Sequence, residues 1–415
     1  MTVTLAGMGL VVQKFGGTSV ADPERIRAVA DQVALVRRRG DAVVVVVSAM
    51  GTETDELLHL AEQVSSMRTG REVDMLITAG ERKATALLCL ALHEMGVRAE
   101  SYTGSQAGFI TDSTHTNARI VEVRPERIRQ AIEDDIVAVV GGAQGVSKEG
   151  KDVTFFGRGG SDTTAVALAS ALGADACELY TDVSGVFTAD PRLVADARRL
   201  HRVSFDEMLE MCATGCPKPA MRSVEFARRH GVPLHVRSSF TWEPGTWITE
   251  EDPDMEQAVI SAVTHDASEA KVTITGVPDR PGVAATVFRR LADDGVNVDM
   301  IVQNVSDHGV TDISFTVPRG DLDRSVAAME ELAGDLEATG VISDDDVARV
   351  SLIGAGMKSN PGVAATMFET LAGSGVNIEM ISTSAIRVSC VVHRSDLEKA
   401  VAALHGAFEL EKTTT

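Results

Sequence analysis

Two stretches of the sequence place glycines next to a cationic side chain, a combination that suits the binding of anions. "KFGG" at 14–17 follows a run of apolar residues, and "GRGGSD" at 157–162 precedes a long apolar segment. Glycine lets the backbone approach a bound group closely, Lys14 supplies a compact positive charge, and Arg158 offers a fork of donors that matches a carboxylate. The two patterns predict a site where a phosphate and a carboxylate meet, which is the requirement for phosphoryl transfer.

Each stretch alone also fits ordinary local structure. A strand that ends in a Gly-Gly turn, or a flexible loop before a capped helix, would produce the same residues. The first stretch lacks the spacing GxxxxGK[ST], so it does not indicate a P-loop nucleotide-binding site. The interpretation therefore depends on the elements that bring the two stretches together.

The composition excludes several classes of partner. The chain of 415 residues is long enough for two or three domains. Its formal net charge of −21 opposes binding to nucleic acid or to an anionic membrane surface, although a few clustered cations can still attract a small anion. The five cysteines form no CxxC pair, so we expect neither a zinc site nor a disulfide framework. Because we find no signal-peptide pattern and no apolar run of membrane length, we expect a cytoplasmic protein.

The first 240 residues alternate short Val- and Ile-rich runs with longer helical patterns. Runs such as "DAVVVVVSAM" and "DIVAVVGGAQG" are apolar throughout, which is typical of parallel strands covered on both faces. The predicted fold is α/β, a three-layer αβα sandwich with a mostly parallel central sheet. "SDTTAVALASALGA" predicts a helix capped by Ser161 or Asp162 and ended by a glycine. Ligands of such folds bind outside the carboxyl ends of the strands, where both glycine-rich stretches fall.

The second part of the chain contains a duplication. "VPDRPGVAATVFRRLADDGVNVDMI" at 277–301 matches "MKSNPGVAATMFETLAGSGVNIEMI" at 357–381. Each copy predicts a strand, a helix that opens at Pro-Gly and stops at Gly, and a strand that starts at Val-Asn. The acidic segment 241–257 shows no clear period and predicts a linker. We therefore expect domains at 1–250, 265–343 and 348–412, the last two with α+β folds.

Five motifs together resemble the aspartate kinase family of amino acid kinases. They are "KFGGTSV" at 14–20, "SAMG" at 48–51, "TAGER" at 78–82, "GRGGSDTTA" at 157–165 and "TDVSGVFTADPR" at 181–192. The duplicated tail resembles the paired ACT regulatory domains of that family, which are ferredoxin-like. The resemblance implies an amino acid kinase fold and the phosphorylation of the side-chain carboxylate of L-aspartate by ATP with Mg²⁺, which gives 4-phospho-L-aspartate.

The resemblance also implies roles for individual residues. Lys14, Arg158 and Asp162 are the predicted catalytic residues, with Lys14 at the transferring phosphoryl group. The residues expected to bind aspartate are Ser48, Thr52, Glu81, Arg158, Gly159, Gly160 and Ser161. The residues expected to bind ATP are Lys14, Phe15, Gly16, Gly17, Thr181, Asp182, Phe187, Arg192 and Lys218. We expect no metal site built from protein ligands, because nucleotide oxygens and water would hold Mg²⁺.

Two of these residues have plain structural explanations as well. Glu81 near a helix start would stabilise the helix dipole without any ligand. Asp182 directly after a strand would serve equally well as a turn residue. Both explanations stay open at the level of the sequence.

For the ACT-like domains, the resemblance implies feedback regulation by lysine, threonine or both. The helix start after each Pro-Gly offers N–H groups to a carboxylate. The residues expected to bind effectors are Asp279, Pro281, Gly282, Ala284, Asn297, Gln303, Asn360, Asn377 and Ile378. The alternative is that the two domains only hold subunits together. The resemblance further implies a homo-oligomer formed through these domains, and an internal start at Met255 would permit an α2β2 assembly.

Three positions depart from the pattern of the family. In "TGCPKPAMRS" at 214–223, Pro217 takes the place of a nucleotide-binding lysine, which moves one residue on to Lys218. Ala143 stands where relatives often have Phe. Ala385 stands where relatives often have Glu beside the effector interface, which predicts weakened feedback.

Two rival functions also stay open, a kinase for another amino-acid carboxylate and an amino-acid sensor that has lost turnover.

Overall fold

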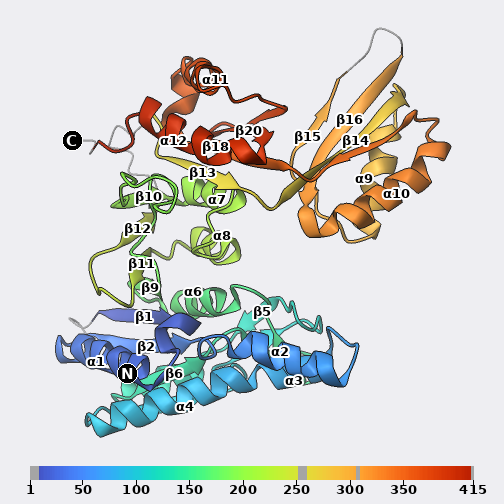
Figure 1. Ribbon diagram of the computed structural model, residues 1–415. Coiled ribbons are helices and arrows are strands. Elements are labelled where there is room, and N and C mark those ends of the chain that lie inside the picture. Colours follow the sequence, from blue (N-terminus) through green and yellow to red (C-terminus); the bar gives the residue numbers. More distant parts are fainter. Residues whose placement is uncertain (1–8, 251–258, 305–308, 413–415) are drawn as a thin grey trace. The chain divides into compact units, whose positions relative to one another are not determined.

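The computed structural model describes residues 9–250, 259–304 and 309–412, which form two compact units (Figure 1). The first unit contains strands β1 to β12 with their helices. The second contains β13 and the elements that follow it, together with Phe187–Arg198 and Ala213–Cys216. Met255, the predicted internal start, lies outside the described residues. The domain boundaries expected from the sequence stay predictions.

An eight-stranded sheet forms the centre of the first unit. Its paired strands run parallel except for β11 and β12, which are antiparallel, so the predicted mostly parallel sheet is confirmed. In order across the sheet, the strands are β10 (Arg202–Ser204), β12 (Thr246–Thr249), β11 (Leu234–Ser238), β9 (Ala176–Thr181), β1 (Leu10–Phe15), β2 (Ala42–Val47), β6 (Val137–Gly141) and β3 (Ala99–Tyr102). Because β12 lies inside 241–257, the expected linker is wrong for these four residues.

Helices cover both faces of this sheet, which explains the apolar sequence of its central strands (Figure 1). α1 and α4 pack on one face against Val43, Val45 and Val47. α5 and α6 cover the other face, and all six residues of β2 are buried, so the predicted three-layer sandwich is confirmed. The helices of this unit are η1 (Gly17–Val20), α1 (Pro23–Arg38), α2 (Glu53–Val64), α3 (Arg71–Ile77), α4 (Ala79–Glu94), α5 (Glu126–Glu133), α6 (Gly160–Leu172), α7 (Phe205–Ala213) and α8 (Met221–His230).

A small mixed sheet in the first unit was not expected from the sequence. Its order is β5 (Ile120–Val123), β4 (Phe109–Thr111), β7 (Gln144–Ser147) and β8 (Val153–Phe155). The run "DIVAVVGGAQG" is therefore two strands, β6 and β7, separated by a turn at Gly142 and Ala143, where Ala143 has a φ of +57°. The small sheet matters for function because β8 leads directly into the loop 157–160.

The duplicated part contains two four-stranded antiparallel sheets, each with two α-helices, which confirms the predicted α+β folds. The first sheet has the order β15 (Ile301–Gln303), β16 (Val310–Pro318), β14 (Glu269–Pro278) and β17 (Gly340–Asp344). The second has the order β13 (Ala262–Asp266), β18 (Val347–Ile353), β20 (Arg387–His393) and β19 (Met380–Thr383). The helices are α9 (Val283–Asp293), η2 (Arg319–Asp321), α10 (Leu322–Asp335), η3 (Ala355–Ser359), α11 (Val363–Gly373), η4 (Arg394–Asp396) and α12 (Leu397–Ala407).

The sheets differ in one connection. β13 precedes the first copy in the sequence but pairs with β18 of the second copy, so the first copy is inserted between two strands of the second sheet. The helices stop before Gly295 and Gly375, both with positive φ, as predicted. The strands expected to start at Val-Asn begin later, at Ile301 and Met380, because Val296 and Val376 pack into the cores beneath the sheets instead.

Two reciprocal ion pairs join the copies. Lys271 in β14 and Arg349 in β18 occupy equivalent positions of the repeat, and so do Asp299 and Glu379. Arg349 pairs with Asp299 of the first copy, while Lys271 pairs with Glu379 of the second. Arg349 is nearly fully buried and also contacts Glu269 at 2.8 Å. The two copies therefore contact each other through two equivalent ion pairs, each between a basic residue of one copy and an acidic residue of the other.

None of the helices described here is both long enough and apolar enough to cross a membrane.

We expect the buried pair to dominate the stability of the second unit. Arg349→Met should lower its free energy of unfolding by about 3–5 kcal/mol, because it leaves the buried Glu269 carboxylate uncompensated. Lys271→Met is the control, and it should cost about 1 kcal/mol or less because the side chains of its pair are 23% and 20% exposed. Urea unfolding followed by circular dichroism measures both. Equal losses in the two variants would contradict the dominance of Arg349.

Candidate active site

Four neighbouring strands of the main sheet end at one edge and place the predicted motifs there. β9, β1, β2 and β6 are adjacent and parallel, so their carboxyl ends meet. Gly16 follows β1, Ser48 follows β2, Gly142 follows β6, and Asp182 follows β9. Four stretches that are far apart in the sequence are thereby brought together.

The centre of this edge is an ion pair between a strand and a helix. Lys14 Nζ lies 2.6 Å from Asp162 Oδ1, and the two side chains are only 12% and 13% exposed. Asp162 Oδ2 also accepts a hydrogen bond from Ala220 N at 3.2 Å, just before α8. A pair this well shielded from water keeps more of its attraction than a surface pair. The contact therefore holds the Lys14 ammonium group in place at the edge where the strands end.

Close neighbours shape the backbone at 15–17. Gly16 N donates to Tyr180 O at 3.2 Å, so this N–H is used within the protein. A β-carbon on residue 17 would lie 2.9 Å from both Ala49 O and Gly51 O, so only glycine fits there. The Phe15 ring is fully buried and stacks on Tyr180 with centroids 4.7 Å apart. The Phe15 side chain belongs to the core, so the expected contact of residue 15 with the nucleotide would have to come from its backbone and stays a prediction.

The loop 157–160 presents the expected carboxylate-binding arginine to solvent. Arg158 is exposed and has no hydrogen bond or ion pair within the described ranges. Gly159 has a φ of +71° and is the N-cap of α6, so the expected cap at Ser161 or Asp162 is wrong, and both lie in the first helical turn. Because a β-carbon on Gly159 would lie 2.4 Å from Ala220 Cβ, the loop can pass this close to α8 only with glycine.

Glu81, in the first turn of α4, is a buried carboxylate with an unused oxygen. Its exposed fraction is 2%, and its Oε2 atom has no hydrogen-bond partner among the described residues. Burial raises the pKa of Glu81 to about 7, and the charge of Glu53 adds to this rise, while backbone N–H groups of Glu81 and Ala49 and the charge of Arg82 oppose it. A residue that only stabilised a helix dipole would not need this burial, so the environment favours a ligand with N–H donors.

A second ion pair lies at the end of β9. Asp182 Oδ1 lies 2.5 Å from Lys218 Nζ and accepts a hydrogen bond from Thr181 Oγ1 at 2.9 Å. Burial alone would raise the pKa of Asp182, but the hydrogen bonds from Lys218 and Thr181 outweigh it and lower the pKa. The shifted lysine therefore reaches a residue that the sequence assigned to the nucleotide.

The other residues expected at the substrate lie at the same edge of the first unit. Ser48 N donates to Phe15 O at 3.1 Å. Thr52 is the N-cap residue of α2, and its Oγ1 donates to Glu56 Oε1 at 2.7 Å. Ser161 packs so closely against Gly142 that a β-carbon on residue 142 would lie 2.6 Å from Ser161 Oγ.

Two residues expected at the nucleotide, Phe187 and Arg192, belong to the second unit, and their role stays a prediction.

Two acidic residues near the site were not singled out from the sequence, although the segment 52–56 that contains Glu53 resembles part of the family's substrate loop. Asp74 in α3 is fully buried and accepts hydrogen bonds from Thr116 N at 2.9 Å and Phe155 N at 3.0 Å, so it ties α3 to β8 and to the loop beside Gly157. Glu53 opens α2 beside Thr52 and forms an ion pair with Lys83. A charged residue among the apolar residues of "VDMLI" at 73–77 was the available signal for Asp74. Nothing local distinguished Glu53 from its acidic neighbours.

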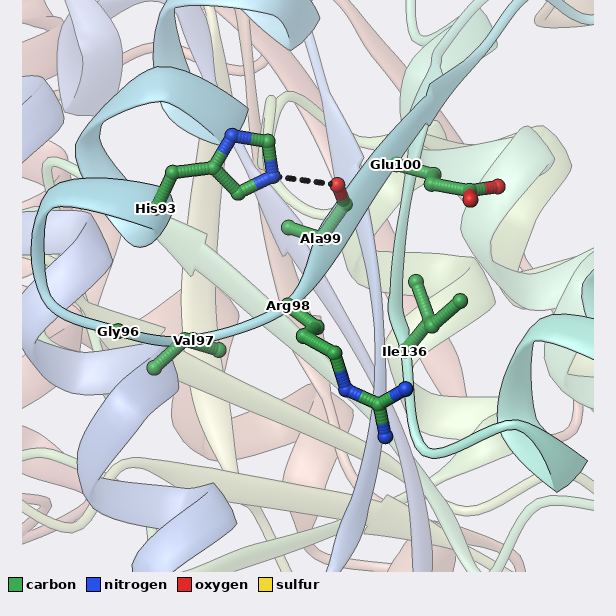
Figure 2. A pocket seen from close by; sticks show the side chains of 7 residues that line it. All are labelled: His93, Gly96, Val97, Arg98, Ala99, Glu100 and Ile136. Atoms are coloured by element: carbon green, nitrogen blue, oxygen red, sulfur yellow. Dashed lines mark hydrogen bonds between the residues drawn. The ribbon is translucent and has the colours of Figure 1, made fainter.

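Two cavities lie away from this edge. One of about 520 Å³ is lined by His93, Arg98, Glu100 and Ile136 (Figure 2). These residues precede or open β3 and β6, so this cavity lies at the amino ends of the strands, opposite the candidate site. The other, of about 270 Å³, lies in the second copy of the duplication and is lined by Met357, Asn360, Pro361, Val363, Ala364, Ser384, Ala385 and Val388.

The second cavity contains two of the expected effector residues, Asn360 and Pro361, and the departure Ala385. Asn377 is exposed and Ile378 packs against the core of the second copy. In the first copy, Gly282 has a φ of +101° at the start of α9, and Asp279 N donates to Gly309 O at 2.9 Å. The remaining expected residues of that copy are Pro281, Ala284, Asn297 and Gln303. All effector assignments stay predictions.

Comparison with known proteins shows a relation along nearly the whole chain. The model of the "Amino acid kinase family" matches residues 9–238, and the model of the "ACT domain" matches residues 272–332 and 350–408. The chain is 54% identical to an aspartokinase of Mycolicibacterium smegmatis over 407 residues, which are 97% of each protein. It resembles E. coli aspartokinase III in complex with aspartate and ADP, with a TM-score of 0.81 and 26% identity over 96% of this chain and 99% of that one. The TM-score is 0.76, with the same identity and coverage, for the complex of that enzyme with lysine and aspartate.

The two glycines that flank α6 give a matched test of the site geometry. Gly173 has a φ of +70° with nothing near its missing β-carbon, so Gly173→Ala should cost about 1 kcal/mol of stability and leave activity intact. Gly159→Ala carries the same backbone strain plus the clash with Ala220, which displaces Arg158. We expect kcat/KM to fall roughly a hundredfold, the effect of misplacing a binding group by about 1 Å. Similar activity in both variants would show that the loop position is unimportant.

Proposed function

Since the chain belongs to the aspartokinase family, we propose that the γ-phosphoryl group of ATP is transferred to L-aspartate at the edge of its main sheet, by the residues described above. The enzyme is a phosphotransferase with a carboxyl group as acceptor, and its reaction gives 4-phospho-L-aspartate. The observation that carries the assignment of roles is the shielded Lys14–Asp162 pair at the carboxyl ends of the strands. The pair fixes the position of the Lys14 ammonium group, whose remaining N–H donors can face the two anions.

The chemistry requires charge neutralisation more than proton transfer. A side-chain oxygen of aspartate forms a bond to the γ-phosphorus of ATP while the bond from that phosphorus to the bridging oxygen breaks, and ADP leaves with the electron pair. The attacking carboxylate is already ionised at neutral pH, so no general base is needed. Asp162 is therefore not a base. It orients Lys14, and Lys14 stabilises the charge on the transferring group.

The charges at the substrate end complement an amino acid. We assign the exposed Arg158 to the α-carboxylate, which its two-pronged guanidinium can bind through parallel hydrogen bonds. Ser161, in the first turn of α6, offers a hydroxyl to the same ligand. The unpartnered Oε2 of Glu81 accepts from the α-ammonium group, which supplies the donor that this buried oxygen lacks. These contacts leave the side-chain carboxylate of aspartate facing Lys14.

We place the nucleotide beside Gly17, Thr181, Asp182 and Lys218. Gly17 opens η1 and has no side chain to keep a phosphate from its backbone, whereas the N–H of Gly16 is already bonded. ATP brings Mg²⁺ in such reactions, where the ion supplies positive charge between the β- and γ-phosphates. The described parts of the chain contain no cluster of three or more metal-ligating side chains, so phosphate oxygens and water would hold the ion.

We further propose that amino acids regulate the enzyme through its ACT domains. The E. coli relative has been crystallised with lysine and aspartate, and the cavity beside Asn360 and Ala385 offers space for an effector such as lysine or threonine.

Ile301 and Ile381, at equivalent positions on the edge strands β15 and β19, are 50% and 44% exposed. Such apolar edges suit pairing with another subunit, so we propose a cytoplasmic homo-oligomer. An α2β2 assembly from Met255 stays a prediction.

The assignment of the catalytic residues is tested by removing single charges. Arg158→Ala and Asp162→Ala should each lower kcat/KM for aspartate by roughly a hundredfold or more, because each removes a charge that stabilises the transition state. A hydroxamate assay for the acyl phosphate measures the product directly. Arg229→Ala, an exposed arginine at the end of α8, is the control and should leave activity unchanged.

Retained activity in Arg158→Ala or Asp162→Ala, with the fold intact by circular dichroism, would overturn the assigned roles. Wild-type protein that binds aspartate but forms no acyl phosphate would instead support the sensor without turnover.

The effector site is tested by restoring a charge. Ala385→Glu puts a carboxylate in the wall of the second cavity, where it can pair with the ammonium group of lysine. We expect the lysine concentration for half-inhibition to fall roughly tenfold, as one charged hydrogen bond of about 1.4 kcal/mol would give. Ala385→Gln, which has the same size without the charge, should change it much less. Strong inhibition of the wild-type protein with no further gain in Ala385→Glu would refute the role of this position.

A further inference from the structure

Glu53, at the start of α2, is held by a lysine through only one of its two oxygens. Glu53 Oε1 lies 2.6 Å from Lys83 Nζ, which is half exposed on α4. The other oxygen, Oε2, is buried and has no hydrogen-bond partner among the residues that the structure describes. An ordinary ion pair between two surface helices would leave this oxygen in contact with water. Here it faces the protein instead.

The unpaired oxygen points at the turn that carries Glu81. A β-carbon on Gly80 would lie 3.4 Å from both the carboxyl carbon and Oε2 of Glu53, so this carboxylate packs directly against the residue before Glu81. Gly80 also packs against Ala49, whose N–H group bonds the Glu81 carboxylate. Two carboxylates from different helices therefore converge on the first turn of α4, and each keeps a buried oxygen without a donor.

Two unsatisfied carboxylate oxygens at one place are costly unless a ligand pairs with them. A primary ammonium group has three N–H donors and a positive charge, so it can satisfy both oxygens at once. With Glu81 ionised, the Glu53–Lys83 pair and Glu81 together carry one net negative charge, which one ammonium group neutralises. A phosphate, a carboxylate or a neutral hydroxyl cannot do so.

We propose that Glu53 is a second carboxylate for the substrate's α-ammonium group, and that Lys83 holds it in position from the solvent side. This inference rests on the proposed function, because it takes Glu81 as the first carboxylate of that subsite. It makes Glu53 a determinant of specificity: the enzyme selects an α-amino dicarboxylate and rejects a dicarboxylate of the same length that lacks the amino group. For the rejected ligand, both buried oxygens stay unpaired and repel its charge.

The charges around Glu81 make the proposal measurable by pH. The groups that face its carboxylate are Glu53 of α2, Arg82 of α4 and the N–H groups of residues 49 and 81. Glu81 must be ionised to bind an ammonium group, so kcat/KM for aspartate falls as the pH drops through its pKa of about 7. A negative Glu53 opposes ionisation of Glu81, so its loss moves this acid limb to lower pH. Loss of Lys83 leaves Glu53 less compensated and moves the limb to higher pH.

The experiment compares Glu53→Gln, Lys83→Gln and Glu81→Gln in the full-length enzyme. We expect Glu53→Gln to raise the KM for aspartate tenfold or more with the KM for ATP unchanged, and to shift the acid limb of kcat/KM downward. Lys83→Gln should shift the limb upward. The inhibition constant of succinate, which lacks the amino group, should exceed the KM for aspartate at least a hundredfold in the wild type. It should be lower in Glu53→Gln than in the wild type. If the Glu53–Lys83 salt bridge were merely structural, the acid limbs of Glu53→Gln and Lys83→Gln would not shift in opposite directions.

The possible failures are distinguishable. If Glu81→Gln raises the KM for aspartate but Glu53→Gln changes neither that KM nor the acid limb, the second carboxylate is refuted and the proposed function stands. If Glu81→Gln leaves the KM unchanged, the assignment of the ammonium subsite fails and this inference fails with it. If Glu53→Gln does not fold, the half-exposed Lys83→Gln decides, because an unchanged acid limb in that variant contradicts the coupling.

Discussion

The structure of the first unit depends on one electrostatic constraint, that two anions must be brought within bonding distance of each other. The Lys14–Asp162 pair answers it by fixing a cation between the end of a strand and the start of a helix, away from bulk water. A lysine on a flexible loop would lose this advantage, because its ammonium group would be solvated and would have to be ordered in every catalytic cycle. The parallel sheet supplies the rigid frame, since adjacent strands end together and their loops inherit fixed positions.

The glycines follow from the same constraint. Residues 17 and 159 have no side chain because the backbone passes within contact distance of neighbouring loops, not because the loops need freedom to move. At residue 17 the neighbours are the carbonyl groups of the loop after β2, and at residue 159 the neighbour is the start of α8. Each close approach packs one motif against another, so the loops after β1 and β2, and the loop 157–160 and the start of α8, hold fixed relative positions.

Periodic and apolar patterns made the architecture predictable, whereas contacts between distant segments did not leave a local trace. The run "DAVVVVVSAM" identified β2 because a strand buried on both faces needs no polar position. The cap of α6 was misassigned because Ser161 and Asp162 are good caps by residue type, while the positive φ of Gly159 depends on the nearness of Ala220. Likewise β13 pairs with β18 although the whole first copy lies between them in the sequence, so no local pattern predicts this pairing. The motifs identified Lys14 and Asp162, but they did not predict that the two side chains form an ion pair.

Charge explains how so acidic a protein can bind two anions. A net charge of −21 sets the far field, which repels polyanions, but the field inside a shielded cleft depends on the nearest few groups. In the proposed assignment, the first unit offers the carboxylates of Glu53 and Glu81 and the cations Arg158 and Lys14. Aspartate complements them with one positive charge at its nitrogen and two negative carboxylates. In that assignment, binding neutralises charges in pairs, while the net negative charge of the chain opposes the approach of larger polyanions.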